Sequence, residues 1–261
     1  MEVVITADPR EAGRLGADIV SALIRKRPDA VLGLATGSSP VVIYDELGRR
    51  VREGELSLRQ ARAFILDEYL GLPQEHPEAY RNVIHRDFVS KVDIDPSNVH
   101  SPTVFGDDVP AACAAYEAAI AAAGGIDVQY LGLGTDGHIA FNEPSSSLAS
   151  RTRVKALTPQ TRADNARFFG GDLDGVPTHA VTQGVATIME ARHLVLIASG
   201  ESKAEAIRHV VEGAVSASWP ATMLQMHPHV TVFLDPGSAS LLERRQYYEY
   251  TFTTKPGWQG L

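Results

Sequence analysis

The sequence has a single cysteine, Cys113, among its 261 residues and no long uninterrupted apolar run. One cysteine excludes an internal disulfide framework. Without a run of about 18 apolar residues, no transmembrane helix and no membrane partner are expected. The first residues, MEVVITADPREAG, lack the basic start and apolar stretch of a signal peptide. We therefore expect a soluble cytoplasmic protein.

Basic residues are outnumbered as well. The chain has 24 Lys and Arg against 32 Asp and Glu, for a net charge of −8. Proteins that bind a phosphate backbone usually carry an excess of Lys and Arg on one face, so no nucleic-acid partner is expected. Cys113 lies in the alanine-rich stretch AACAAYEAAIAAA, where a buried small side chain is favoured over a reactive thiol.

Short apolar runs alternate with helical patterns along the chain. The pattern predicts strands at 2–5, 30–36, 62–66, 126–134, 193–199 and 229–234. It predicts helices at 10–26, from about residue 40, at 204–213 and at about 238–250. This alternation predicts an α/β fold with a doubly wound, mostly parallel sheet in a Rossmann-like three-layer arrangement. We expect one domain over residues 1–261, because α/β domains of this length are common.

Four chemically rich loops follow the predicted strands: TGSSP, LDEYLGLP, GTDGHIAFNEP and SGESK. Carboxyl ends of parallel strands meet at one edge of a sheet, where ligands bind in such folds. The polar, glycine-rich segment of about 145–181 has one expected helix near TPQTRADNARFF. Such an excursion over a strand edge predicts a lid.

The loop LGLGTDGHIAFNEP contains G-x-G-x-x-G at Gly132, Gly134 and Gly137. The dinucleotide fingerprint requires a helix directly after the glycines. Pro144 and three serines stand where that helix would begin, which argues against a dinucleotide cofactor.

Asp136, His138 and Glu143 lie in the same loop. All three side chains can bind a metal, but D-x-H-x4-E matches no common zinc pattern. A structural reading would make His138 an ordinary loop histidine. We favour acid/base chemistry, because a histidine beside carboxylates has the tautomer control and tuned pKa that proton transfer near neutral pH requires.

Five stretches together resemble the glucosamine-6-phosphate deaminase family: LATGSSP, LDEYLGLP, LGLGTDGHIAFNEP, SLASRTRVKALTPQTRADNARFF and ASGESKAEAI. The resemblance runs from near the amino terminus to about Asp235, and the later segment is less diagnostic. It implies conversion of glucosamine 6-phosphate to fructose 6-phosphate and ammonia. It implies no organic cofactor and no catalytic metal.

The resemblance also assigns catalytic roles. Asp67 matches the base that moves a proton from C2 to C1 of the open-chain sugar, whereas Glu68 is interpreted as structural. His138 matches the residue that opens the pyranose ring. Asp136 and Glu143 match the acidic partners that set the charge and orientation of the imidazole.

For the substrate phosphate, the resemblance points to Gly37, Ser38 and Ser39 at a helix start, where backbone N–H groups and the dipole favour an anion. Lys203 would add a point charge, and Arg167 would reach over from the lid as a fork-shaped donor. Each of these residues alone could be a helix cap or a solvated charge.

Some family members are hexamers activated by N-acetylglucosamine 6-phosphate at a subunit interface. Ser146, Arg153 and Lys155 match positions of that effector site, which makes a homo-oligomer with allosteric control a further hypothesis.

Three other functions are kept open. A 6-phosphogluconolactonase has a related fold and a DGH loop but needs no C2 base, so LDEYLGLP and IAFNEP favour the deaminase. Galactosamine 6-phosphate could use the same acid/base groups. A non-catalytic sugar-phosphate-sensing domain would normally carry a basic DNA-binding module, and none is visible in the sequence.

Overall fold

The computed structural model describes residues 1–104 and 108–261. A seven-stranded sheet with parallel pairing runs through the molecule in the order β1-β10-β9-β6-β2-β3-β5. Its strands are short and almost wholly apolar, as expected for a sheet covered on both faces. Their bounds are Glu2–Ile5 (β1), Val31–Leu34 (β2), Arg62–Ile65 (β3), Val99–His100 (β5), Val128–Leu131 (β6), His193–Ala198 (β9) and Val230–Leu234 (β10).

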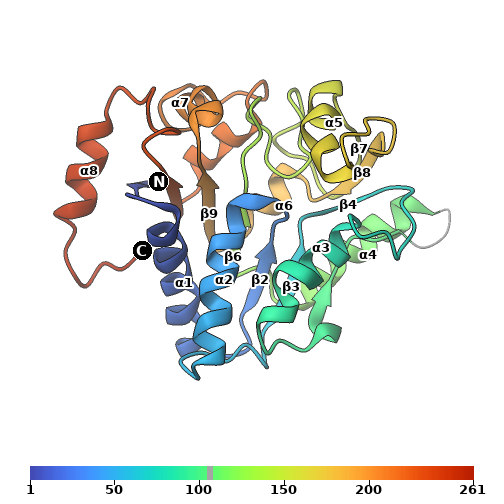
Figure 1. The fold of residues 1–261 in the computed structure, drawn as a ribbon, viewed down its shortest axis with the longest axis horizontal. Helices are drawn as coiled ribbons and strands as arrows, with labels where there is room; N and C mark the ends of the chain where they lie inside the picture. The colour runs from blue at the N-terminus through green and yellow to red at the C-terminus, as the bar shows by residue number, and fades with distance from the viewer. Residues whose placement is uncertain (105–107) are drawn as a thin grey trace.

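Helices cover both faces of this sheet (Figure 1). The chain moves one way across the sheet from β1 to β2 and β3, and the other way from β5 to β6, β9 and β10. Right-handed crossovers therefore place the connecting helices of the two halves on opposite faces. The helices are α1 (Pro9–Lys26), α2 (Ser38–Arg52), α3 (Tyr80–Asp87), α4 (Val109–Ala122), α6 (Val185–Met189) and α7 (Ala204–Glu212). The doubly wound prediction is confirmed.

The direction of winding reverses between β2 and β6, which lie side by side in the sheet. In open α/β sheets, the crevice outside the carboxyl ends of the strands at such a point is the usual ligand site. The loop after β2 is TGSS, and the loop after β6 is GLGTDGHIAFNEP. Two of the four predicted loops therefore flank the switch point.

A second, antiparallel sheet of three strands was absent from the sequence-based prediction. It pairs β4 (Asp67–Tyr69) with β8 (His179–Thr182), and β8 with β7 (Arg153–Ala156). The two sheets join at Leu66, whose N–H donates to the carbonyl of Leu34 while its own carbonyl accepts from the N–H of Gln183. The residues DEY, predicted as a loop, thus form a strand of the small sheet.

The predicted lid segment, residues 145–181, contains β7, most of β8, α5 (Pro159–Asn165) and the short 3-10 helix η3 (Ala166–Phe169). The expected helix near TPQTRADNARFF is confirmed. In Figure 1 this part of the chain lies with the small sheet at one end of the molecule. It has a small core of its own, which contains Tyr69, Phe141, Leu157, Ala166, Val176 and Ala180.

The predicted last helix is wrong in its start. Residues 238–244 are mostly turns, and the helix α8 (Arg245–Thr253) begins only afterwards and packs against β1. The Asp235 carboxylate accepts from the backbone N–H groups of Ser238 and of the distant Gly200, so the chain after β10 folds back into a turn. Cys113 is buried in α4, as predicted. Within the described residues, no helix is long and apolar enough to span a membrane.

Candidate active site

The loop after β6 folds around the ring of His138. A Cβ atom on Gly134 would lie 2.3 Å from Nδ1 of His138, so only glycine lets the imidazole pack there. Gly137 has a φ of +80°, a backbone conformation that favours glycine. No helix follows this loop. Gly134 and Gly137 thus make room for the His138 ring and allow the turn before it. The glycines therefore do not indicate a dinucleotide-binding loop.

The imidazole of His138 lies between two carboxylates. Its Nδ1 atom is 2.7 Å from Oδ1 of Asp136 and 3.6 Å from Oε2 of Glu143. Burial alone would raise the pKa of Asp136, but its contacts with His138 outweigh burial and lower it. The ring is about one-fifth exposed, so its other nitrogen can face a ligand. The two carboxylates therefore hold the ring in one orientation.

Glu143 is 3% exposed, and its two oxygens have different surroundings. Oε1 accepts from the N–H of Thr158 at 3.1 Å, whereas Oε2 is buried without a hydrogen-bond partner and faces His138. An unpaired buried carboxylate oxygen is costly unless it meets a positive charge. Oε2 of Glu143 is therefore left to interact with His138.

The same three side chains could offer a metal three ligand atoms within 4.8 Å of one another. Two ligands bound at about 2.1 Å to one tetrahedral ion lie about 3.4 Å apart. The 2.7 Å between His138 and Asp136 is shorter than that and is a hydrogen-bond distance. The trio as built fits proton transfer better than metal ligation.

Asp67 begins β4 and is 5% exposed. Burial, with a smaller contribution from the charge of Glu68, raises its pKa well above the ordinary value. Its cross-strand partner is Thr182, whose Oγ1 accepts from the N–H of Phe141 in the His138 loop. Opposite residues of an antiparallel pair share a face, so Asp67 lies on the face that meets this loop.

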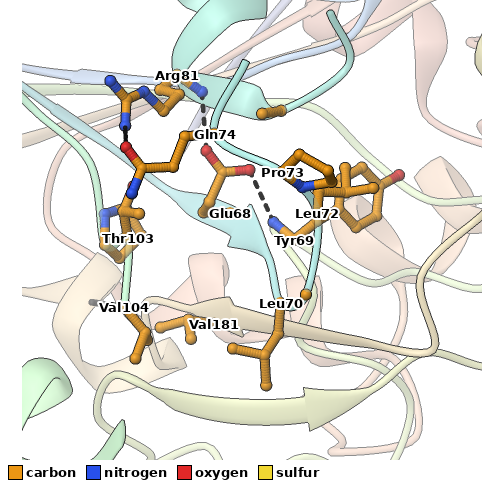
Figure 2. Close-up of a pocket in the computed structure, with 13 residues that line it drawn as sticks. Glu68, Tyr69, Leu70, Leu72, Pro73, Gln74, Arg81, Thr103, Val104 and Val181 are labelled. Atoms are coloured by element: carbon orange, nitrogen blue, oxygen red, sulfur yellow. Dashed lines mark hydrogen bonds between the residues drawn. The ribbon is translucent and has the colours of Figure 1, made fainter. Parts of the chain in front are cut away.

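Glu68 has a different environment from Asp67. Its carboxylate accepts from the backbone N–H groups of Tyr69, Tyr80 and Arg81 at 2.8–2.9 Å, and so closes the amino end of α3. Figure 2 shows the bonds from Tyr69 and Arg81. Burial raises its pKa, and these three donors oppose that effect. Glu68 lines a cavity of about 470 Å³ that Asp67 and His138 do not line. These contacts agree with the structural interpretation of Glu68.

Gly37, Ser38 and Ser39 form the start of α2, as the sequence predicts. Gly37 has a φ of +92°, and no side chain caps the helix. Its first N–H groups are therefore left for an external acceptor, and the helix dipole favours an anion there. A Cβ on Gly37 would meet nothing within 4 Å, so the space beside it is open.

Lys203 and Arg167 are close enough for the charge of Arg167 to act on Lys203. Burial lowers the pKa of Lys203, Arg167 lowers it further, and the carboxylates of Asp164 and Asp136 raise it. Among the described residues, neither cation has a carboxylate oxygen within 4.0 Å. Two neighbouring cations of this kind can bind a doubly charged anion such as a phosphate.

Ser146, Arg153 and Lys155 also lie near the His138 loop. Arg153 and Lys155 alternate on β7 and therefore share a face. Arg153 donates to Oδ1 of Asn142 at 2.9 Å, four residues beyond His138. The hydroxyl of Ser146 is buried and has no hydrogen-bond partner.

Four residues that were not predicted from the sequence link β4, α3, α5 and the His138 loop: Tyr69, Tyr80, Asn165 and Thr182. The Tyr69 hydroxyl accepts from Asn165 and from Tyr80, and Thr182 connects β4 to the His138 loop. One available signal was the alternation that places Tyr69 on the same strand face as Asp67. Thr182 and Asn165 gave no such signal, because their partners are far away in the sequence.

The fold and site together define a doubly wound α/β protein of the enzyme type, with acid/base groups and an anion site at the carboxyl ends of its parallel strands. Residues 10–233 match the family model described as glucosamine-6-phosphate isomerases/6-phosphogluconolactonase. The chain belongs to this family.

Its relatives include proteins named glucosamine-6-phosphate deaminase. The one from Mycolicibacterium smegmatis is 66% identical and the one from Streptomyces coelicolor 53%, each over the whole of both chains. A solved structure described as a monomeric glucosamine-6-phosphate deaminase is 41% identical, with a TM-score of 0.89 over 92% of this chain and 100% of that one. A 6-phosphogluconolactonase from Trypanosoma cruzi has a TM-score of 0.73 over 93% and 97% of the two chains, but at 22% identity it shares the fold alone.

Proposed function

We propose that this protein deaminates glucosamine 6-phosphate to fructose 6-phosphate and ammonia. The observation that carries the proposal is the presence of two groups suited to proton transfer in the segments that follow β3 and β6: a buried carboxylate, Asp67, and an imidazole, His138, that lies between two carboxylates. The names of full-length relatives at 53–66% identity support the same reaction. A lactonase would need no buried base beside the His138 loop.

The first step is ring opening at His138. The imidazole takes the proton of the C1 hydroxyl and delivers a proton to the ring oxygen, so the C1–O5 bond breaks and an aldehyde forms. Asp136 and Glu143 stabilise the imidazolium during this transfer and hold its orientation.

The second step is proton transfer at Asp67. The carboxylate removes the proton from C2 while the C1 carbonyl oxygen gains a proton, which gives an enolamine. Asp67 then returns its proton to C1 while the nitrogen loses one, which leaves an imine at C2 and a hydroxyl at C1. Water then adds to C2, and ammonia leaves to give the ketose. The raised pKa of Asp67 suits this role, because a carboxylate whose pKa lies above its ordinary value is a stronger base towards the C2 proton.

The phosphate is held by the start of α2 and by two cations. We infer that Gly37, Ser38 and Ser39 donate backbone and hydroxyl hydrogens, while Lys203 and Arg167 neutralise the charge. The whole chain would then be one catalytic domain, with residues 145–181 as a lid that carries Arg167 to the ligand.

We further infer an effector site for a sugar phosphate at Ser146, Arg153 and Lys155. Its support is the hydrogen bond from Arg153 to Asn142, which links this surface to the His138 loop. A sigmoidal rate curve that becomes hyperbolic with N-acetylglucosamine 6-phosphate is the expected result. A hyperbolic curve unmoved by that effector contradicts the inference, and sedimentation with and without it tests for an oligomer.

The experiment that tests the main proposal measures ammonia and fructose 6-phosphate released from glucosamine 6-phosphate in metal-free buffer. Galactosamine 6-phosphate and 6-phosphogluconolactone are run in parallel, with Asp67→Asn as the variant. We expect equal amounts of both products from the gluco substrate and none from the variant. Lactone hydrolysis alone, or binding without turnover, would overturn the proposal.

A further inference from the structure

Tyr69 stands at the meeting point of the base strand and the predicted lid. It lies two residues beyond Asp67 in β4, so both side chains point to the same face. Its ring is 5% exposed, and its hydroxyl accepts from Nδ2 of Asn165 at 2.9 Å. Asn165 is the last residue of α5, and 96 residues separate it from Tyr69.

Arg167 is carried by a short segment that Tyr69 contacts on both sides. Asn165 precedes Arg167 by two residues and bonds the Tyr69 hydroxyl. Phe169 follows it by two and packs edge-on against the Tyr69 ring, with 5.7 Å between ring centroids. His76 stacks on the other side of Phe169 at 5.6 Å. The position of Arg167 therefore depends on how this segment sits on Tyr69.

The Tyr69 hydroxyl is itself held from the opposite side. The Tyr80 hydroxyl lies 3.4 Å from it, and the side chain of Thr36, next to Gly37, lies near the Tyr80 hydroxyl. The backbone N–H of Tyr80 donates to Glu68, the residue between Asp67 and Tyr69. A connected set of contacts thus runs from the α2 phosphate loop through Tyr80 and Tyr69 to the segment that carries Arg167.

We propose that Tyr69 and Asn165 are positioning residues, and that their hydrogen bond is a catch which holds Arg167 in place to bind the substrate phosphate. The inference rests on the proposed function, because Arg167 acts through that phosphate. The catch explains why a tyrosine and not a phenylalanine occupies this buried position: the ring fills the small core, and only the hydroxyl reaches Asn165.

The phenol is suited to this task over the whole working pH range. Burial raises the pKa of Tyr69 to about 12, so the hydroxyl stays neutral and does not titrate with the acid/base groups. Loss of the catch should therefore change substrate binding without moving the pH optimum. A role in proton transfer would move it, which separates positioning from chemistry.

The test compares Tyr69→Phe and Asn165→Ala with the wild type in steady-state kinetics. Each variant should raise the KM for glucosamine 6-phosphate about two- to tenfold, the worth of one neutral hydrogen bond, with kcat changed by less than twofold. Tyr130→Phe removes the hydroxyl of another fully buried tyrosine and is the matched control, with no change expected. Thermal unfolding of each variant confirms that it is folded.

A double-mutant cycle with Arg167→Met decides whether the catch works through Arg167. If it does, Tyr69→Phe raises KM no further in the Arg167→Met background. The proposal would be overturned if the KM increases of the two single variants multiply in the double variant, or if Tyr69→Phe shifts the pH optimum.

Hydrogen–deuterium exchange gives a readout that needs no turnover. Amides of residues 159–169 should exchange faster in Tyr69→Phe, while those of β6 and β9 stay unchanged. Unchanged exchange at 159–169 overturns the catch even if the enzyme is active. The two proposals can fail separately. If the wild type releases no ammonia but Tyr69→Phe still shows the faster exchange, the proposed function is overturned and the catch is retained.

Discussion

Asp67 and Glu68 are adjacent carboxylates whose side chains leave β4 on opposite faces and have different tasks. Asp67 faces the His138 loop through Thr182, whereas Glu68 closes the amino end of α3 with three backbone hydrogen bonds. We therefore expect opposite effects on catalysis and stability when each of these two carboxylates is neutralised.

Asp67→Asn should abolish exchange of the C2 proton with solvent deuterium and leave sugar-phosphate binding intact, because it removes the base and no phosphate ligand. Glu68→Gln should retain exchange but lower the free energy of unfolding by about 1–3 kcal/mol, since three N–H groups lose a charged acceptor. NMR of the substrate and chemical denaturation measure the two effects. Loss of exchange in Glu68→Gln in a folded protein would contradict this division of roles.

Asp67→Asn should also stabilise the protein at neutral pH. The folded-state pKa of Asp67 lies above its ordinary value of 3.8, so ionisation of the buried carboxyl costs stability as pH rises through the folded pKa. Asparagine is neutral and removes that cost. Denaturation curves should show a gain at pH 7.5 that disappears below about pH 4, where aspartate is protonated in both states. A gain that persists at pH 3 would refute the electrostatic cause.

His138→Gln should slow turnover of the cyclic substrate by about 100-fold or more, as expected when a general acid/base is removed. Glutamine keeps polar atoms near Asp136 and Glu143 but cannot carry a proton. The turnover rate of a substrate presented in open-chain form should fall much less, because that substrate does not need ring opening. Single-turnover rates on the two forms measure the difference, and equal losses would argue against this role.

Lys203→Met should raise KM by about 10- to 100-fold, the worth of a lost charge-assisted hydrogen bond, with a smaller effect on kcat. Methionine retains the length of the side chain and removes its charge. Inorganic phosphate should protect the wild type against thermal unfolding and protect the variant much less. Lys91→Met, which removes a surface lysine paired with Asp45, is the control and should behave like the wild type.

We expect His193 to lower the free energy of unfolding in mild acid, an effect separate from catalysis. It is 5% exposed, stacks on His229 at 3.6 Å, and burial lowers its pKa to about 3. The unfolded chain binds a proton below about pH 6.5 and the folded chain does not, so stability is full above pH 6.5 and falls from there towards pH 3. His193→Gln should weaken this pH dependence, which urea denaturation at pH 4 and 7 measures. An unchanged slope would show that other groups cause it.

Much of the large sheet could be predicted from local pattern. Runs such as VLGL and LVLIA contain no polar side chain, and this pattern is typical of strands covered on both faces. Pro144 correctly indicated that no helix follows the glycine-rich loop. These features depend on neighbouring residues, so the sequence reveals them directly.

The small sheet could not be predicted in the same way. Its strands are three or four residues long, and β4 pairs with a strand more than 100 residues away. The turn after β10 depends on Asp235 meeting Gly200, again far apart in sequence. The contacts of Tyr69 with Asn165 have the same origin. Such features arise from tertiary contacts, and local propensity carries little information about them.

Leu66 is shared by the two sheets: its N–H donates to Leu34 in the large sheet, and its carbonyl accepts from Gln183 at the end of the small one. Asp67 is the next residue along the chain, so its backbone is anchored beside the large sheet. Sequence changes farther out in the small sheet should therefore shift this carboxylate less than they shift the residues around them.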